Sequence, residues 1–179
     1  MHKNRGKTSG FTLLELMVTL AIAAILASLA APSFSDIIKN NRMTTQYNEL
    51  LASLSVARSE AIKRGATVTV CKSIDQASCS GNWKDGWIIF VESNTTGGTA
   101  GTVDSGEDIL RVHAALSGGN TLSFARNRVS YGSDALATGF TGTFILCDDR
   151  GDSARKGLLV SNTGRVRQAI ASDTLASCP

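Results

Sequence analysis

The pattern of apolar and polar residues divides the chain into three parts, and the first is a long apolar run. The run extends from Phe11 to Ala31 and follows a short leader that holds three basic residues and no acidic residue. Because a helix of about 20 residues crosses a bilayer, we expect a transmembrane helix half over residues 11–34. The basic leader, residues 1–10, predicts that the N-terminus stays on the cytoplasmic side of the membrane.

A helical pattern continues beyond the apolar run, over residues 35–65. Apolar residues recur there every three or four positions, which is the periodicity of one face of an α-helix. The stripe consists of Tyr47, Leu50, Leu51, Leu54, Ala57, Ala61 and Ile62. Gly65 follows it as a typical helix stop, whereas Pro32 removes a backbone hydrogen bond and predicts a kink. The pattern predicts an amphipathic helix half that packs on a folded domain.

From residue 66 onward the pattern changes to short β-type runs separated by Gly, Ser, Asn and Asp. The expected strands are Ala66–Cys71, Gly86–Glu92, Ile109–Ala115, Thr121–Ala125, Val129–Tyr131, Thr141–Cys147, Gly157–Ser161 and Arg165–Ile170. Short runs at regular spacing favour an antiparallel sheet or sandwich. We therefore expect an α+β protein, in which a long N-terminal helix packs on an antiparallel β-sandwich head at residues 66–179.

A single acidic residue, Glu15, interrupts the apolar run. An unpaired carboxylate at the centre of a membrane helix costs roughly 2.5–3.5 kcal/mol, so Glu15 needs a partner. The sequence Gly-Phe-Thr-Leu-Leu-Glu-Leu-Met, residues 10–17, resembles the processing site of type IV pilins and type II secretion pseudopilins. The resemblance implies that a prepilin peptidase cleaves between Gly10 and Phe11 and methylates Phe11. It also implies that Glu15 pairs with the amino terminus of a neighbouring subunit during assembly.

A secretory signal peptide is the competing interpretation of the same run, since residues 27–31 could serve as a small-residue cleavage site. The glycine before Phe11 and the fixed glutamate favour the pilin interpretation. Further motifs extend the resemblance into the head: residues 57–64, 68–71, 83–90, 106–110 and 157–167 look like the GspH/FimT family. This family covers minor pilins and the minor pseudopilin of type II secretion, and it implies a helix packed on a β-sandwich.

Four cysteines, Cys71, Cys79, Cys147 and Cys178, lie beyond the apolar run and would face an oxidising compartment. Four cysteines allow three pairings. We favour a short local bridge between Cys71 and Cys79, and a bridge between Cys147 and Cys178 that pins the C-terminal tail.

Charge and chemistry-bearing residues argue against an enzyme or a metalloprotein. The net charge of +3 belongs to the leader: removal of Lys3, Arg5 and Lys7 would leave fifteen basic and fifteen acidic residues. The absence of a Cys-x-x-Cys pair disfavours zinc, and residues 148–152 lack the calcium-loop spacing, so a solvated turn is expected there. His113, the only histidine beyond the leader, is expected at the surface or half-buried. We expect no catalytic residues, cofactor or metal.

One local excess of positive charge lies near the C-terminus, where residues 153–171 hold four basic residues and no acidic one. Alternation along a strand would place Arg165 and Arg167 on one face, about 7 Å apart, and paired guanidiniums suit phosphate oxygens. Gly164-Arg165-Val166-Arg167 also resembles the Gly-Arg-x-Arg element associated with DNA binding in FimT-type minor pilins of naturally transformable bacteria. The resemblance implies DNA contacts at Arg165 and Arg167, and charge proximity adds Arg155 and Lys156. The alternative is that these arginines only solvate the surface or pair with acidic residues 148, 149 or 152.

These patterns lead to one expected function and two alternatives. We expect a minor type IV pilin, single-pass in the bacterial inner membrane, with a periplasmic head that becomes extracellular in a pilus. Its expected partners are other pilins, the prepilin peptidase, the inner membrane and DNA, which it would bind without sequence preference for uptake in natural transformation. The first alternative is a structural minor pilin that primes or connects the pilus tip. The second is the H-type minor pseudopilin of a type II protein secretion system.

Overall fold

The computed structural model describes residues 10–92, 99–170, 173 and 175–178, and for residues 29–33 it describes the backbone alone. The leader therefore lies outside the described residues, apart from Gly10. The chain divides into two compact units, Met1–Asn40 and Asn41–Pro179, and helix α1 (Leu13–Arg64) contributes to both.

Local hydrogen bonds define both ends of helix α1. At the N-terminal end, the Glu15 backbone N–H donates to the Thr12 hydroxyl at 3.2 Å, which satisfies one of the free donors of the first turn. At the other end, Gly65 has a φ of +61°. The Gly65 N–H donates to Ile62 O at 3.4 Å and the Ala66 N–H to Ala61 O at 3.3 Å, which together form a Schellman motif. Gly65 is thus the helix stop that the sequence predicts, and the helix continues through Pro32.

In the first unit, the described apolar side chains of the helix are exposed. Phe11 is 85% exposed, and large apolar side chains between Leu13 and Leu26 are 50–77% exposed. Among the described residues, no helix combines the length and the apolarity that crossing a membrane requires. The membrane half at residues 11–34 stays a prediction.

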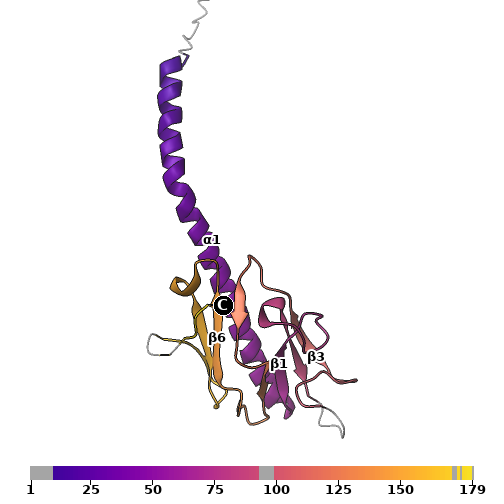
Figure 1. Cartoon of the computed structure of the whole chain (residues 1–179). Coiled ribbons are helices and arrows are strands. Elements are labelled where there is room, and N and C mark those ends of the chain that lie inside the picture. Colours follow the sequence, from indigo (N-terminus) through magenta and orange to yellow (C-terminus); the bar gives the residue numbers. More distant parts are fainter. Residues whose placement is uncertain (1–9, 93–98, 171–172, 174, 179) are drawn as a thin grey trace, which may run out of the picture. The chain divides into compact units, whose positions relative to one another are not determined.

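The second unit contains two four-stranded antiparallel sheets (Figure 1). The first has the order β3-β2-β1-β5, with β1 Val68–Lys72, β2 Trp87–Val91, β3 Ile109–His113 and β5 Arg128–Tyr131. The second has the order β4-β6-β7-β8, with β4 Thr121–Ser123, β6 Gly142–Cys147, β7 Lys156–Val160 and β8 Val166–Gln168. Two short 3₁₀ helices, η1 Trp83–Asp85 and η2 Gly151–Ser153, lie in the connections. The expected α+β class is confirmed, and each expected strand overlaps an observed one.

One hydrophobic core joins the two sheets to the second half of helix α1. Strand residues alternate between faces, so Val68 and Val70 of β1 point into this core together with residues of β2, β5, β6 and β7. From the helix the core receives Met43, Leu50, Leu54, Ala57 and Ala61. Most of the predicted stripe is therefore buried or partly buried, but Ile62 is 57% exposed. Ile62 instead lines a surface groove beside the β7–β8 turn.

The cysteines form the two favoured bridges, Cys71–Cys79 and Cys147–Cys178. On the outer face of the first sheet, Cys71 packs with Ile88 and Phe90 in a second, smaller hydrophobic cluster, against which Cys79 lies. The bridge from Cys147 spans 31 residues and fixes the C-terminal segment to the end of β6.

Candidate functional site

The turn between β7 and β8 carries the Gly-Arg-x-Arg sequence, and Gly164 shapes it. Gly164 has a φ of +70°, and a Cβ atom at this position would lie 2.1 Å from the Ala135 carbonyl oxygen. The turn is closed by a hydrogen bond from the Gly164 N–H to Ser161 O at 2.9 Å. Only glycine fits such a conformation and such a close backbone approach without strain. Gly164 therefore serves the geometry of the turn, not a direct contact through a side chain.

Arg165 lies in this turn, one residue before β8 begins. Its side chain is exposed and forms no hydrogen bond or ion pair with another described residue, while its carbonyl accepts hydrogen bonds from the Ser161 N–H and hydroxyl at 3.0 and 3.1 Å. Arg165 lines a groove of about 290 Å³, which we call the turn groove. The turn groove is lined by Ser55, Arg58, Ser59 and Ile62 of α1 and by Gly164, Arg165 and Val166.

Arg167 has a different environment, because it is held by a carboxylate of the C-terminal segment. Its Nη1 and Nη2 donate to the two Asp173 carboxylate oxygens at 2.7 and 2.8 Å. These hydrogen bonds, together with the Ile170 N–H, lower the pKa of Asp173 to about 2. The sequence does predict that Arg167 could be neutralised, but it points to acidic residues 148, 149 or 152. The structure thus presents the guanidinium of Arg165 alone, not the expected pair.

The two residues added from charge proximity are also engaged. Arg155 Nη1 lies 3.2 Å from Asp152 Oδ1 and donates to Ala176 O at 3.2 Å. Lys156 Nζ donates to the Thr44 hydroxyl at 2.7 Å, and it lies 6.0 Å from the centre of the Tyr47 ring. Lys156 therefore contacts helix α1, and Arg155 contacts the C-terminal segment. Neither side chain extends the exposed positive charge of Arg165.

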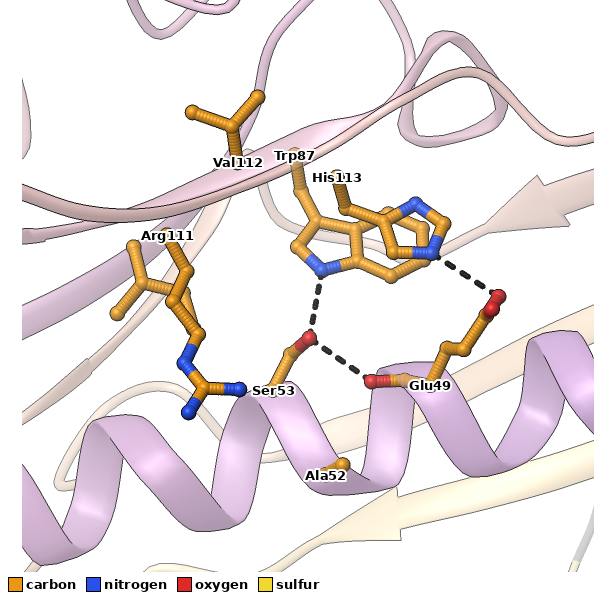
Figure 2. A pocket seen from close by; sticks show the side chains of 8 residues that line it. Glu49, Ala52, Ser53, Trp87, Arg111, Val112 and His113 are labelled. Atoms are coloured by element: carbon orange, nitrogen blue, oxygen red, sulfur yellow. Dashed lines mark hydrogen bonds and ion pairs between the residues drawn. The ribbon is translucent and has the colours of Figure 1, made fainter.

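A cluster around Trp87 and His113 was not predicted from the sequence. The two rings stack in parallel, with their centres 3.8 Å apart and an angle of 4° between their planes (Figure 2). Trp87 Nε1 donates to the Ser53 hydroxyl at 2.9 Å, and His113 Nε2 lies 3.0 Å from Glu49 Oε2. His113 Nδ1 lies 2.7 Å from Ala114 O.

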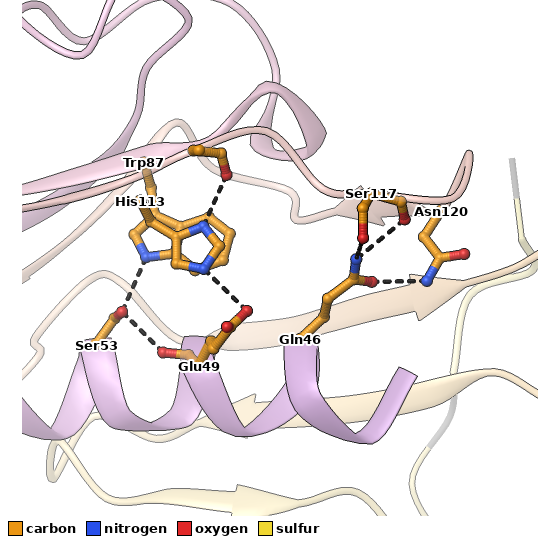
Figure 3. A network of polar contacts seen from close by, with 8 residues as sticks. Gln46, Glu49, Ser53, Trp87, His113, Ser117 and Asn120 are labelled. Atoms are coloured by element: carbon orange, nitrogen blue, oxygen red, sulfur yellow. Dashed lines mark hydrogen bonds and ion pairs between the residues drawn. The ribbon is translucent and has the colours of Figure 1, made fainter. Parts of the chain in front are cut away.

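The Trp87–His113 cluster lies where α1 meets β3, a boundary that we call the α1–β3 seam. Two adjoining grooves of about 190 and 430 Å³ lie along it. Glu49, Val112 and His113 line both. Close to His113, Gln46 donates to Ser117 O at 3.1 Å and accepts a hydrogen bond from buried Asn120 at 2.6 Å (Figure 3). This network fixes the segment after β3 to the helix. His113 is half-buried, as the sequence predicts, and its contacts are structural.

Among the residues that the structure describes, no group of three potential metal ligands is close enough to hold an ion. Near the N-terminus, Gly10, Phe11 and Glu15 are all exposed. Their predicted roles in cleavage, methylation and assembly stay predictions.

Comparison with known proteins agrees with this architecture. Fimbrial protein Q of Moraxella bovis is 35% identical over 91 residues, which are 51% of this chain and 51% of that protein. The type IV major fimbrial protein FimA of Dichelobacter nodosus is 29% identical over 98 residues, 55% of this chain and 48% of that protein. The chain therefore spans about half the length of the curated relatives that it matches.

A likeness in fold covers more of the chain. The crystal structure of the type IV minor pilin FimU of Pseudomonas aeruginosa superposes with a TM-score of 0.59 at 22% identity, covering 79% of this chain and 98% of that one. A prokaryotic N-terminal methylation motif matches residues 5–31. A family model described as type II transport protein GspH matches residues 46–164. With this match over most of its length and the methylation motif before it, the chain belongs to the GspH family of pilin-like proteins.

Proposed function

We propose that this chain is a minor type IV pilin that assembles through its N-terminal helix and binds the phosphate backbone of DNA through Arg165. The assembly part rests on the exposed apolar surface of α1, where large side chains between Leu13 and Leu26 have no cover within the described chain. Such a surface needs lipid or the helices of neighbouring pilins around it. The methylation motif at residues 5–31 supports both environments in succession: a single pass through the inner membrane before assembly and a filament after it.

In this proposal the prepilin peptidase cleaves after Gly10, and the methylated Phe11 becomes the new N-terminus. The Glu15 carboxylate then pairs with the N-terminal amine of a neighbouring subunit, because an unpaired carboxylate in apolar surroundings costs roughly 2.5–3.5 kcal/mol. The test compares the wild type with Glu15→Ala, measured as the fraction of the subunit in sheared filaments relative to membranes. We expect Glu15→Ala to accumulate in membranes. Wild-type entry of Glu15→Ala into filaments would refute the pairing.

The observation that carries the DNA-binding part is the exposed guanidinium of Arg165 on a groove whose described lining contains no carboxylate. Each phosphate that a protein neutralises on duplex DNA contributes about −0.9 to the slope of log affinity against log salt. With Arg155, Arg167 and Lys156 engaged elsewhere, we expect a shallow slope of roughly −1 to −2. Single subunits will then bind weakly, and several of them at a filament tip would gain by avidity.

The experiment is a salt series of duplex-DNA binding by the wild type, Arg165→Ala and Arg111→Ala. Arg111 is the matched control, because it is also an exposed arginine but lies on β3 of the other sheet. We expect Arg165→Ala to flatten the slope by about 0.9 and Arg111→Ala to leave it unchanged. Equal effects of the two variants would mean that net charge, not this site, attracts DNA.

A structural role is the second candidate function, and a specific observation favours it. Asp173 and Asp152 already pair with Arg167 and Arg155, so most of the predicted charge acts within the head. A connector or priming subunit of the pilus tip needs no DNA contact. Neither does the H-type pseudopilin of a type II secretion system, which fits the family description "type II transport protein GspH". Absence of DNA binding by the wild type at low salt, together with loss of piliation or of protein secretion on deletion, would establish this alternative.

A further inference from the structure

Helix α1 contributes a second arginine to the turn groove. Arg58 Nε donates to Ala135 O at 3.3 Å, and Arg58 Nη2 donates to Thr163 O at 3.1 Å. The Nε atom also lies 3.2 Å from the place where a Cβ of Gly164 would be. The guanidinium therefore spans from the helix to the β7–β8 turn and holds the segment that carries Arg165.

Arg58 has more N–H donors than its bonds to the two carbonyls use. A guanidinium has five N–H donors, and two of them are used in these bonds, so three remain for a ligand. Arg58 is half-buried, and it lines the turn groove together with Arg165. A partly desolvated guanidinium attracts an anion more strongly than one in open water, because water screens the interaction less.

The other residues that line the turn groove carry no carboxylate that would neutralise the two arginines, and no free side-chain donor that would act in their place. The hydroxyls of Ser55 and Ser59 donate to Leu51 O and Val56 O of their own helix, at 2.8 and 2.9 Å. A phosphodiester accepts hydrogen bonds but has no proton to donate. With both hydroxyl protons used within the helix, the arginines are the lining side chains that can donate to it. The C-terminal end of a helix carries an opposing charge of about −0.5, which two full positive charges outweigh.

From these contacts we infer that Arg58 and Arg165 contact neighbouring backbone phosphates of one strand along the turn groove, one each, and that Arg58 also positions the turn. This inference rests on the proposed DNA binding and adds a second ligand from a different element. It distinguishes the turn groove from the α1–β3 seam, where Glu49 lies among the lining residues. The same chemistry would accept any polyanion with accessible phosphate oxygens. Backbone phosphate is favoured because the groove offers charge without aromatic side chains for stacking on bases.

The test uses the full chain in a non-ionic detergent and a labelled duplex of about 20 base pairs, with salt slope and affinity as separate readouts. For Arg58→Met we expect a slope flatter by about 0.9 and an affinity reduced several-fold. For Arg58→Lys we expect the wild-type slope, because the charge stays, and a lower affinity, because a single ammonium nitrogen lacks the planar fork that reaches Ala135 O and Thr163 O from two nitrogens. An unchanged slope in a folded Arg58→Met would overturn the phosphate contact and leave Arg58 with positioning alone.

A second variant keeps the inference testable if Arg58→Met does not fold. Ser59→Glu adds a carboxylate to the exposed helix side of the turn groove and should weaken binding. Thr45→Glu is the matched control: it adds the same charge to the same helix 14 residues away, about 21 Å along the axis, beyond the screening length of about 10 Å at 0.1 M salt. Equal weakening by both variants would overturn the site. Loss of binding in Arg165→Ala with none in Ser59→Glu would overturn this inference while the proposed function stands.

Discussion

Replacement of Asp173 by asparagine should strengthen DNA binding, because Asp173 holds the arginine that the sequence places beside Arg165. The Arg167 side chain is 35% exposed and that of Asp173 is 17% exposed, so the pair lies at the surface, within reach of a ligand. Asparagine has the shape of aspartate and its oxygen can still accept the Ile170 N–H, which donates at 2.7 Å in the wild type. The substitution therefore removes one negative charge and leaves the local backbone bond in place.

The expected magnitude follows from counterion release. If Arg167 becomes a phosphate contact, the salt slope on duplex DNA steepens by about 0.9. Between about 200 mM and about 50 mM salt, this change corresponds to an additional factor of about 3.5 in affinity. Fluorescence anisotropy with a labelled duplex measures both quantities.

The matched control is Asp108→Asn, which changes the net charge equally. The Asp108 side chain is 78% exposed, and its nearest described cation, Arg64, lies 4.0 Å away. A slope that does not change in Asp173→Asn, or that changes equally in Asp108→Asn, would refute the reasoning that Asp173 masks a phosphate ligand.

Three further predictions concern the same region. The pKa of Asp173 is lowered from 3.8 to about 2, so its contribution to stability is complete above pH 3.8 and is lost only as the pH falls toward 2. Asp173 therefore stays charged and bound to Arg167 at both pH 7.5 and pH 5, and protonation of Asp173 should not change the DNA affinity between these two values. Gly164→Ala should lower the free energy of unfolding by about 1–3 kcal/mol in a denaturant titration, because its Cβ would meet Ala135 O, and an unchanged midpoint would contradict the strained turn. Loss of the Cys147–Cys178 bridge through Cys178→Ser should cost roughly 3–4 kcal/mol for a 31-residue loop, and a thermal midpoint equal to that of the wild type would contradict this.

The sequence predicts the strands and the helix stop well because these depend on local patterns. Alternating apolar residues bury Val68 and Val70 whatever their distant partners are. The helix ends at Gly65 through equally local bonds, from the Gly65 N–H three residues back and from the Ala66 N–H five residues back. The short spacing of Cys71 and Cys79, and the place of Cys178 in the C-terminal tail, likewise favour the two disulfides that form. Ile62 has the periodicity of the apolar stripe, yet it is exposed. Periodicity identifies one face of the helix, but it cannot show at which residue the sheets stop covering that face.

The candidate site is predicted less completely because its charges depend on the conformation of the C-terminal tail and on one contact between distant segments. Strand alternation places Arg165 and Arg167 on one face only if both lie in the strand, and β8 begins at Val166. Asp173, six residues beyond Arg167, is brought back to it within the tail that the disulfide fixes. Arg58 lies 105 residues before Thr163, whose carbonyl it holds, so no local pattern could show that bond. Only the fold brings these residues together.

The most direct measurement is an amide chemical-shift map of the head, residues 41–179, titrated with a short DNA duplex at low salt. If the turn groove binds the backbone, the largest shifts will lie at residues 161–168 and along residues 55–62 of the helix, and they will disappear in Arg165→Ala. Shifts centred on the α1–β3 seam, or no shifts at any DNA concentration, would contradict DNA binding at this site.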